Sequence, residues 1–507
     1  MKKEKRGLRM TVGVLSCMYL FGMHAWAAGT WTEQENGKYS YMDEAGAIHA
    51  KGWIYEAEEG GWYYIDEKGY RVCGKQTIAG DTYFFDENGK MLTGWVACDR
   101  NEAAEEYQGT VSDDDLYYCT ADGKMATGWV TAYDPEEVWS VTDEVFAEMQ
   151  DDEFGMNRYY FEPDGKICRN ERKTIDGKKY VFQEDGTIIT GWIYDYGEGA
   201  SDRYLHVDPD SSDGDKSLCS ENPQNLMFAG DADGALVING WIDAIPPWDD
   251  EDDDGRSFYA DSSGYVVTGE GARGNGSTVV ARRKLQEIEN TGTYTLKDWS
   301  ANVNITRIDG KYYCLEDSGT RLDGILLLTG GGSSGEFADG VYGFVDNAAM
   351  ATGSVLVEHE DDDDIKDGYS YYYYFAKRDD KEYCKGQGVS GVEGGRLYYG
   401  GLAVASQTDT YEVVYLPAVE EKDDKDHGTG FFLVDETGKV LKGSYNGAHY
   451  TSSNGNVYRV KKEDDSNDEY GYIIDYYDGD KDDDDHKIWK SLTEADYDYI
   501  CWEALEE

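Results

Sequence analysis

Basic residues are scarce in this chain. Its 507 residues include 47 Lys and Arg against 103 Asp and Glu, which gives a formal net charge of −56 at pH 7. Nucleic-acid binding depends on basic side chains that neutralise phosphates, so nucleic acid is excluded as a partner. Anionic membrane surfaces attract polybasic segments, and they are disfavoured as partners for the same reason.

The sequence also lacks the motifs of common catalytic and metal centres. It contains no Cys-x-x-Cys, and none of its seven His lies in a His-Glu-x-x-His motif or in a Ser, Cys or Asp arrangement for nucleophilic catalysis. Paired carboxylates are frequent, but a chain this acidic brings them together by chance. We therefore expect a protein that is not an enzyme and that carries no cofactor and no metal.

Acidic runs interrupt the chain at Asp113–Asp115, Asp249–Asp254, Asp361–Asp364 and Asp482–Asp485. Clustered carboxylates could supply oxygen ligands to calcium, but no run has the twelve-residue spacing of an EF-hand loop. Runs of like charge are usually solvated. We therefore expect these four segments to be exposed loops, with calcium binding as the alternative.

Long apolar runs are absent except near the N-terminus. A basic segment is followed by an apolar run from Thr11 to Phe21 and then by Ala25-Trp26-Ala27-Ala28. This order predicts a signal peptide over residues 1–28 and a secreted protein. A membrane anchor is the alternative, but the run is well short of the roughly 20 residues that a spanning helix needs. No later segment could span a membrane, so we expect no membrane insertion.

Eight cysteines follow the predicted signal peptide, and an even number in a secreted protein invites a disulfide interpretation. Cys119 and Cys314 each follow two tyrosines, in the position that Phe85 and Phe161 occupy elsewhere. They therefore resemble apolar fillers of a strand position. We expect mostly free, buried thiols.

Aromatic residues and glycines, by contrast, are abundant and recur in a fixed pattern. Residues 62–69 read Trp-Tyr-Tyr-Ile-Asp-Glu-Lys-Gly, and residues 83–89 read Tyr-Phe-Phe-Asp-Glu-Asn-Gly, with Gly94-Trp95 following. Aromatic runs favour strands, and an acidic turn that ends in Gly is typical of a hairpin. A second Gly follows five or six residues later in most copies. Each copy therefore predicts a hairpin whose apolar face must be covered by its neighbours.

We predict an all-β fold, an elongated solenoid of stacked β-hairpin repeats with acidic loop insertions and a short C-terminal capping helix. The helix is expected because residues 493–496 resemble a capping box and apolar residues follow at helical spacing. The predicted organisation is a signal peptide at 1–28, well-formed Gly-Trp aromatic hairpins at 29–270, a divergent insertion at 271–304, degenerate hairpins at 305–460, and an acidic segment with the helix at 461–507.

The pattern Gly-Trp … Gly-x-Trp-Tyr-Tyr-x-Asp-x-x-Gly-x-x-x-x-Gly-Trp resembles the cell-wall-binding or choline-binding repeat family, which includes glucan-binding repeats and the receptor-binding repeats of clostridial toxins. The resemblance covers residues 37–270 well and residues 305–460 in degraded form. It implies a superhelix of β-hairpins. It leaves the ligand open, since these relatives bind different molecules.

In the resembled family, an aromatic box combines the Trp after Gly with aromatic residues of the following strand. Such a box attracts a quaternary ammonium by cation–π interaction or stacks against a sugar ring. Trp53 is the strongest candidate, because only there does the full pattern survive. Carried over by motif, the candidate residues are Trp53 with Trp62 and Tyr64, Trp95 with Tyr117, Trp129 with Tyr159, Trp192, and Trp241 with Tyr259.

The resemblance implies a secreted, non-catalytic protein associated with the bacterial cell wall. Its expected partner is a cell-wall polymer, either choline-substituted teichoic acid or a glucan. The alternatives are an adhesin or toxin-like module that binds host glycans, and a cell-wall hydrolase whose catalytic part has no recognisable motif.

Overall fold

The structure is a computed structural model that describes most of the chain. The predicted signal peptide 1–28 and the predicted C-terminal helix lie outside the described residues, as do two of the four acidic runs, residues 113–115 and 361–364. The described residues are 29–43, 45–56, 60–97, 116–140, 155–230, 232–250, 253–269, 279–283, 285–287, 294–296, 300–329, 337–345, 347–358, 370–380, 383–406, 410–416, 430–453, 455–461, 472–477, 479–482 and 485–491.

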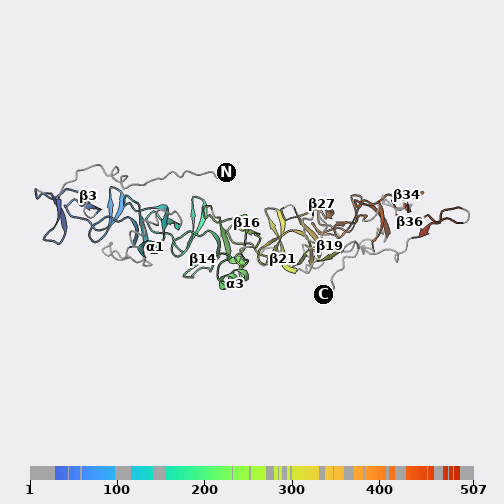
Figure 1. Cartoon of the computed structure of the whole chain (residues 1–507), viewed down its shortest axis with the longest axis horizontal. Helices are drawn as coiled ribbons and strands as arrows, with labels where there is room; N and C mark the ends of the chain where they lie inside the picture. The colour runs from blue at the N-terminus through green and yellow to red at the C-terminus, as the bar shows by residue number, and fades with distance from the viewer. Residues whose placement is uncertain are drawn as a thin grey trace, which may run out of the picture. The chain divides into compact units, whose positions relative to one another are not determined.

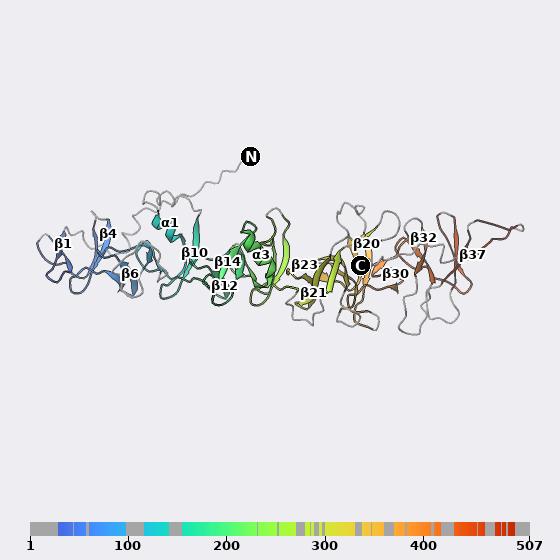
Figure 2. The ribbon, with the colours of Figure 1, turned by 90° about the horizontal axis from the view of Figure 1, so that it is seen from below.

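The chain divides into two compact units. Unit 1 comprises Met1–His206 and Ala229–Leu236, and unit 2 comprises Val207–Phe228 and Val237–Glu507. Both are built mainly from antiparallel strands, which confirms the predicted β class and the many hairpins (Figures 1 and 2).

Unit 1 is a succession of two-stranded antiparallel hairpins that follow one another in chain order (Figure 1). Two further strands, β13 (Gly191–Asp195) and β14 (Tyr204–Val207), come after them. The hairpins are β1 (Gly29–Glu33) with β2 (Tyr39–Asp43), β3 (Gly52–Glu56) with β4 (Gly61–Ile65), β5 (Gly74–Ile78) with β6 (Asp81–Phe85), β7 (Gly94–Ala97) with β8 (Leu116–Cys119), β9 (Gly128–Tyr133) with β10 (Met156–Phe161), and β11 (Glu171–Ile175) with β12 (Lys178–Phe182).

The turn after each second strand explains the recurring spacing between the aromatic run and Gly. After β4, the carboxylate of Asp66 accepts hydrogen bonds from the backbone N–H groups of Lys68 and Tyr70, at 2.8 and 2.9 Å. Gly69 has a φ of +84°, a left-handed conformation that costs Gly little. The chain then returns so that Arg71 forms a bridge with Ile65. An acidic residue three positions before Gly therefore makes the same turn that the sequence pattern predicts.

Consecutive hairpins are joined by a backbone hydrogen bond at this bridge. The residue two positions after the turn Gly donates its N–H to a carbonyl on the second strand of the preceding hairpin. Met91 donates to Trp62 at 2.7 Å, and Arg71 donates to Tyr39 at 2.8 Å. Each hairpin in unit 1 thus covers the one before it, as expected of a repeat array.

Helices occupy parts of the long connections that we expected to be loops. They are α1 (Pro135–Ser140), α3 (Asp213–Glu221) and the 3₁₀ helix η2 (Pro223–Asn225). The Ser212 side chain caps α3 by accepting a hydrogen bond from the N–H of Asp215, with Asp213 and Asp215 in the first turn. This local capping, rather than the repeat pattern, specifies the helix.

Unit 2 contains larger sheets as well as hairpins. The hairpin of β16 and β17 is followed by a seven-stranded sheet in the order β23-β22-β21-β18-β24-β25-β26, a five-stranded sheet in the order β27-β28-β31-β30-β29, the β32/β33 pair and a four-stranded sheet from β34 to β37. A separate pair is formed by β19 and β20. The strands are β15 (Leu226–Ala229), β16 (Gly240–Ala244), β17 (Arg256–Ala260), β18 (Val279–Arg283), β19 (Leu285–Glu287), β20 (Tyr294–Leu296), β21 (Ser300–Ile308), β22 (Lys311–Glu316), β23 (Arg321–Leu322), β24 (Gly324–Thr329), β25 (Gly340–Val345), β26 (Ala349–Met350), β27 (Gly353–Glu358), β28 (Ser370–Phe375), β29 (Gly391–Glu393), β30 (Arg396–Tyr399), β31 (Leu402–Ala403), β32 (Tyr411–Leu416), β33 (Gly430–Asp435), β34 (Ala448–Thr451), β35 (Val457–Lys461), β36 (Tyr472–Tyr477) and β37 (Lys490–Ser491).

Two segments that we predicted to lie outside the repeats contribute strands to these sheets. Within 271–304, β18 pairs with β21 on one side and with β24 on the other. Within 461–507, β36 pairs with β35 and β37. Of the acidic run at 249–254, Asp249 is an exception to the expected exposure, because its side chain is 11% exposed and forms an ion pair with Arg256 at 2.7 Å.

Candidate functional site

Five described tryptophans lie in aromatic boxes of one construction. Each Trp is on the first strand of a hairpin, faces a Tyr on the second strand, and packs on a Tyr of the next hairpin that follows it. The ring centroids are 4.8 to 5.3 Å apart. The sets are Trp31 with Tyr41 and Tyr63, Trp53 with Tyr64 and Tyr83, Trp95 with Tyr118 and Tyr159, Trp129 with Tyr160 and Tyr180, and Trp241 with Tyr259 and Tyr313.

Two further positions complete each box. We call the residue two places before the cross-strand Tyr the flank residue, because it lies on the same face of the strand. We call the residue two places after the turn Gly of the next hairpin the closing residue. In the order of the boxes above, the flank residues are Tyr39, Trp62, Leu116, Arg158 and Ser257, and the closing residues are Arg71, Met91, Ile167, Ile188 and Arg321.

The Trp53 box has two tryptophans. The rings of Trp53 and Trp62 are 6.4 Å apart at 87°, and the ring of Tyr83 lies 5.0 Å from Trp53 at 67°. Tyr64 lies across the hairpin, and Met91 belongs to the same cluster. The structure therefore brings together Trp53, Trp62 and Tyr64, as the sequence predicts, and adds two residues from the next hairpin.

Trp95 and Trp192 are buried more deeply than the other candidate tryptophans. Each is 3% exposed, and the Trp95 Nε1–H donates a hydrogen bond to the Tyr133 carbonyl at 2.8 Å. Trp53, Trp129 and Trp241 are only partly buried. A ligand needs an accessible ring face, so these three boxes are better placed to receive one, whereas Trp95 anchors the junction between two hairpins.

Two of the predicted pairs are wrong by one residue. Trp95 faces Tyr118 rather than Tyr117, and Trp129 faces Tyr160 rather than Tyr159. Neighbouring residues on a strand point to opposite faces, so Tyr159 belongs to the Trp95 box instead. The predicted pairing of Trp241 with Tyr259 is confirmed by their cross-strand register.

Tyr117 packs in a junction whose first strand carries Lys in place of Trp. Its ring lies 4.9 Å from that of Phe84, and the Lys75 Nζ lies 4.4 Å from its centroid.

A sequence signal locates the correct partners. Each cross-strand Tyr lies five residues before the turn Gly, as Tyr64 does before Gly69 and Tyr118 does before Gly123. The closing residue lies two residues after the same type of Gly. Counting back from the turn, rather than forward from Trp, would have found Tyr118 and Tyr160, because insertions change the length of the first connection but not of the turn.

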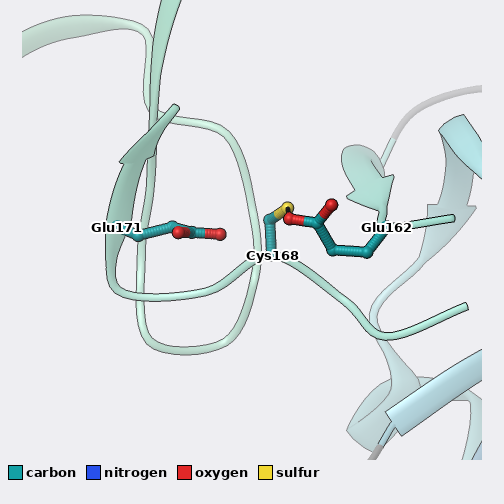
Figure 3. Close-up of side chains that lie close together, drawn as sticks. All are labelled: Glu162, Cys168 and Glu171. Atoms are coloured by element: carbon teal, nitrogen blue, oxygen red, sulfur yellow. Dashed lines mark hydrogen bonds between the residues drawn. The ribbon is translucent and has the colours of Figure 1, made fainter. Parts of the chain in front are cut away.

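Outside the boxes, Glu162, Cys168 and Glu171 lie close together, with one ligand-type atom of each within 4.8 Å of the others (Figure 3). The Lys173 ammonium forms an ion pair with Glu162 and lies 4.0 Å from Glu171, so its single positive charge offsets part of the negative charge of the two carboxylates. Burial raises the pKa of the Cys168 thiol well above its ordinary value, with a further contribution from Glu171. A metal would need the thiolate, so this cluster is better suited to holding β11 against the preceding turn.

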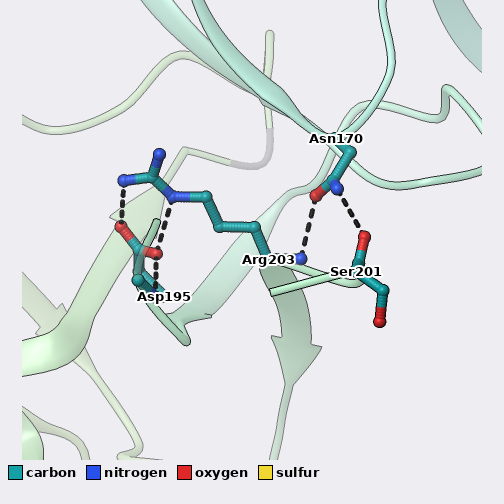
Figure 4. A network of polar contacts seen from close by, with 5 residues as sticks. Asn170, Asp195, Ser201 and Arg203 are labelled. Carbon is teal, nitrogen blue, oxygen red and sulfur yellow. Dashed lines mark hydrogen bonds and ion pairs between the residues drawn. The ribbon is translucent and has the colours of Figure 1, made fainter. Parts of the chain in front are cut away.

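A second polar network fixes the connection between β13 and β14 (Figure 4). Arg203 donates two hydrogen bonds to the buried Asp195 carboxylate, at 2.9 and 3.1 Å. The Asn170 side chain bridges the Ser201 carbonyl and the Arg203 N–H. The network is structural, since it joins the Arg203–Asp195 charge pair and the Asn170 side chain to each other's neighbouring backbone within unit 1.

The six cysteines among the described residues are free thiols, in line with the sequence prediction. Cys119, Cys168, Cys219 and Cys314 are buried. In the described portion of the chain, no helix has both the length and the apolar character needed to cross a membrane.

Comparison with known proteins agrees with the geometry. Residues 72–104 match the model of the choline-binding repeat, and this segment contains Tyr83 and Met91 of the Trp53 box. The resemblance inferred from the sequence is thus confirmed.

Glucosyltransferase-S of Streptococcus mutans is 25% identical over 266 residues, which is 52% of this chain and 14% of that enzyme. Among solved structures, CbpJ of Streptococcus pneumoniae is 15% identical with a TM-score of 0.28, over 77% of this chain and all of that one. The modular autolysin LytC of the same species is 16% identical with a TM-score of 0.26, over 76% of this chain and 54% of that one.

Proposed function

We propose that this chain, which carries choline-binding repeats, is a secreted, non-catalytic protein that attaches to the bacterial cell wall by holding choline groups in the Trp53 box. The expected polymer is a choline-substituted teichoic acid. The single observation that carries the proposal is the pair of perpendicular Trp rings at Trp53 and Trp62, with Tyr83 beside them.

Perpendicular aromatic walls suit a round cation. A quaternary ammonium is attracted by the electron-rich face of each ring, at about 0.5–2 kcal/mol per contact, and Trp offers the strongest face. The rings of Trp62 and Tyr83 are each set at a large angle to the ring of Trp53, so a trimethylammonium group could meet more than one face. Met91 adds a polarizable apolar contact for the methyl groups.

The sugar-binding alternatives use the same rings differently. A glucan or host glycan would stack on one broad ring face, and perpendicular walls leave less room for such a platform. The five residues of the Trp53 box include no carboxylate, His, Cys, Ser or Lys, which favours binding over catalysis. Incubation with purified cell wall in a zymogram tests the hydrolase alternative.

The test is retention of the full chain on a choline resin and its elution by free choline. Replacing Trp53 by Leu removes the π-face while keeping an apolar side chain, so choline affinity should fall about tenfold, the equivalent of one cation–π contact of roughly 1.4 kcal/mol. Trp53→Phe keeps a smaller aromatic face, so its choline affinity should lie between those of the parent and of Trp53→Leu.

A matched concentration of sodium chloride serves as the elution control, because it screens charge without presenting methyl groups. If Trp53→Leu is retained as well as the parent, the site is misplaced. If choline fails to elute the parent while a glucan does, the ligand class is wrong.

A further inference from the structure

Three of the five described boxes contain a cation supplied by the chain itself, and in two of them that cation is the closing residue. In the Trp241 box, the guanidinium carbon of Arg321 lies 4.6 Å from the Trp ring centroid. In the Trp31 box, the guanidinium carbon of Arg71 lies 5.2 Å from the Trp ring centroid and 4.6 Å from that of Tyr39. Both arginines are closing residues.

The Trp53 box has a different residue at the same position. Met91 and Arg71 share a backbone setting, since each donates its N–H to the carbonyl of the flank residue, at 2.7 and 2.8 Å. Each side chain also packs against the turn Gly of the following hairpin. A Cβ added to Gly123 would lie 2.2 Å from the Met91 Sδ, and a Cβ added to Gly89 would lie 2.7 Å from the Arg71 Cγ. The closing position is therefore a fixed slot in which the side chain alone varies.

Arg321 is held in its place by a polar chain. Its Nη2 donates a hydrogen bond to the Ser257 Oγ at 3.0 Å, and the Ser257 hydroxyl donates to the exposed Asp243 carboxylate. The positive charge is thereby fixed over the Trp241 ring. An external cation would have to displace a guanidinium that is already stacked and hydrogen-bonded.

We infer that a basic residue at a variable position decides which boxes accept a quaternary ammonium. At the closing position, Arg71 and Arg321 are internal cations that occupy the Trp31 and Trp241 boxes, whereas Met91 leaves the Trp53 box to an external one. The inference rests on the proposed function in that it takes choline as the ligand. It assigns Arg71 and Arg321 as specificity-determining residues.

In the Trp129 box, the internal cation comes from the flank residue instead of the closing residue. Here the closing residue is Ile188, but the flank residue is Arg158, whose guanidinium carbon lies 4.4 Å from the Trp129 centroid. Its Nη1 also donates to the Asp233 carbonyl at 2.8 Å. In the Trp53 box the flank position holds Trp62, so the box with the complete aromatic pattern has no basic residue at either variable position.

The test exchanges the closing residues in the full chain and counts choline bound by equilibrium dialysis with labelled choline. Arg321→Met gives the Trp241 box the same closing residue type, Met, as the Trp53 box. This variant should bind one more equivalent of choline than the parent. Met91→Arg should remove the equivalent that depends on Trp53. Arg321→Lys keeps a cation at the slot and should bind no more than the parent.

Arg396→Met is the matched control, because its guanidinium carbon lies 4.4 Å from the exposed ring of Tyr372, outside the five Trp boxes. It should leave the number of bound equivalents unchanged. If Arg321→Met melts well below the parent, Arg321→Gln replaces it.

Both exchanges are repeated with Trp53→Leu, which separates this inference from the proposed function. A gain of one equivalent in Arg321→Met with Trp53→Leu supports the inference even if the parent binds nothing at Trp53. No gain in either background overturns it, whether or not the parent binds choline.

Discussion

Buried thiols illustrate how single residues behave in this chain. Cys119, Cys219 and Cys314 are at most 1% exposed, and Cys314 lies among the apolar side chains of the seven-stranded sheet. Burial raises the pKa of the Cys219 thiol to about 12, and the charge of Asp215 adds to the shift. An unfolded thiol has a pKa of about 8.5. The folded chain therefore keeps this proton at pH values where the unfolded chain loses it.

The consequence is a loss of stability at high pH. Between about pH 9 and 12 the unfolded state binds fewer protons at Cys219 than the folded state, so the free energy of unfolding falls as pH rises, by at most about 1.4 kcal/mol per pH unit for this group. Below pH 8 the contribution is fully present. Urea unfolding at pH 8, 9 and 10 should show a shallower decline for Cys219→Ala than for the parent. If the free energy of unfolding falls equally steeply with pH in the two proteins, the fold does not raise the pKa of this thiol.

At the same scale, the sequence predicted the pairs correctly at the Trp53 box, which follows the complete pattern, and at Trp241 with Tyr259, but not at Trp95 or Trp129. Trp53, Trp62 and Tyr64 were found because the full motif fixes their register. Tyr117 and Tyr159 were assigned to the wrong boxes, because a step of one residue turns a side chain to the opposite face. The closing arginines were missed because their role depends on a contact between successive hairpins, which no single repeat displays.

At the scale of the element, the turn Gly of one hairpin packs closely against the closing residue that the preceding hairpin supplies. An added Cβ on Gly123 would lie 2.2 Å from the Met91 Sδ. Gly94 has a nearly equal φ, +75° against +79°, but nothing lies within 4 Å of an added Cβ. These two glycines thus share a backbone requirement and differ in packing.

Gly123→Ala should therefore be more destabilising than Gly94→Ala. Each substitution costs about 1–2 kcal/mol for a left-handed non-Gly residue, but only Gly123→Ala crowds Met91, which adds about 1–3 kcal/mol of overpacking. Thermal melting of the full chain measures the difference. Adding Met91→Ala should recover some of the loss in Gly123→Ala and none in Gly94→Ala. A lack of recovery would place the strain elsewhere.

The hairpins themselves were predictable, because a turn is a local signal that the Asp-to-Gly spacing carries. The wide sheets of unit 2 were not. Joining β18 to β24 pairs residues more than 40 positions apart, and nothing within either strand specifies the other. The strand β36 was obscured in the sequence by the acidic residues around it, although Tyr-Ile-Ile-Asp-Tyr-Tyr is rich in strand-forming types.

At the scale of the whole molecule, the net charge of −56 sets the conditions of binding. A strongly negative chain raises the local concentration of cations and of positively charged ligand groups. Salt reduces this effect, since the screening length is about 10 Å at 0.1 M and about 3 Å at 1 M. The contribution should be modest, because most of the charge lies away from any one box.

Raising sodium chloride from about 0.05 to 0.5 M should therefore weaken choline binding by about threefold and leave binding of a neutral glycan unchanged. Equilibrium dialysis at both salt concentrations checks this, with a neutral glucan oligosaccharide as the comparison. A choline affinity that does not change with salt would mean that the rings act alone and that the chain's charge is irrelevant to its ligand.

The contacts between hairpins in unit 1 run from each hairpin to the next in chain order, and this has a mechanical consequence. Tension applied across the unit would load these junctions in series, so the hairpins would separate singly and absorb work at each step. A ligand that touches both Trp53 and Tyr83 bridges two successive hairpins and would raise the force needed to open that junction. A molecule held to a wall under flow would thus resist unfolding most strongly at the junction that binds its ligand.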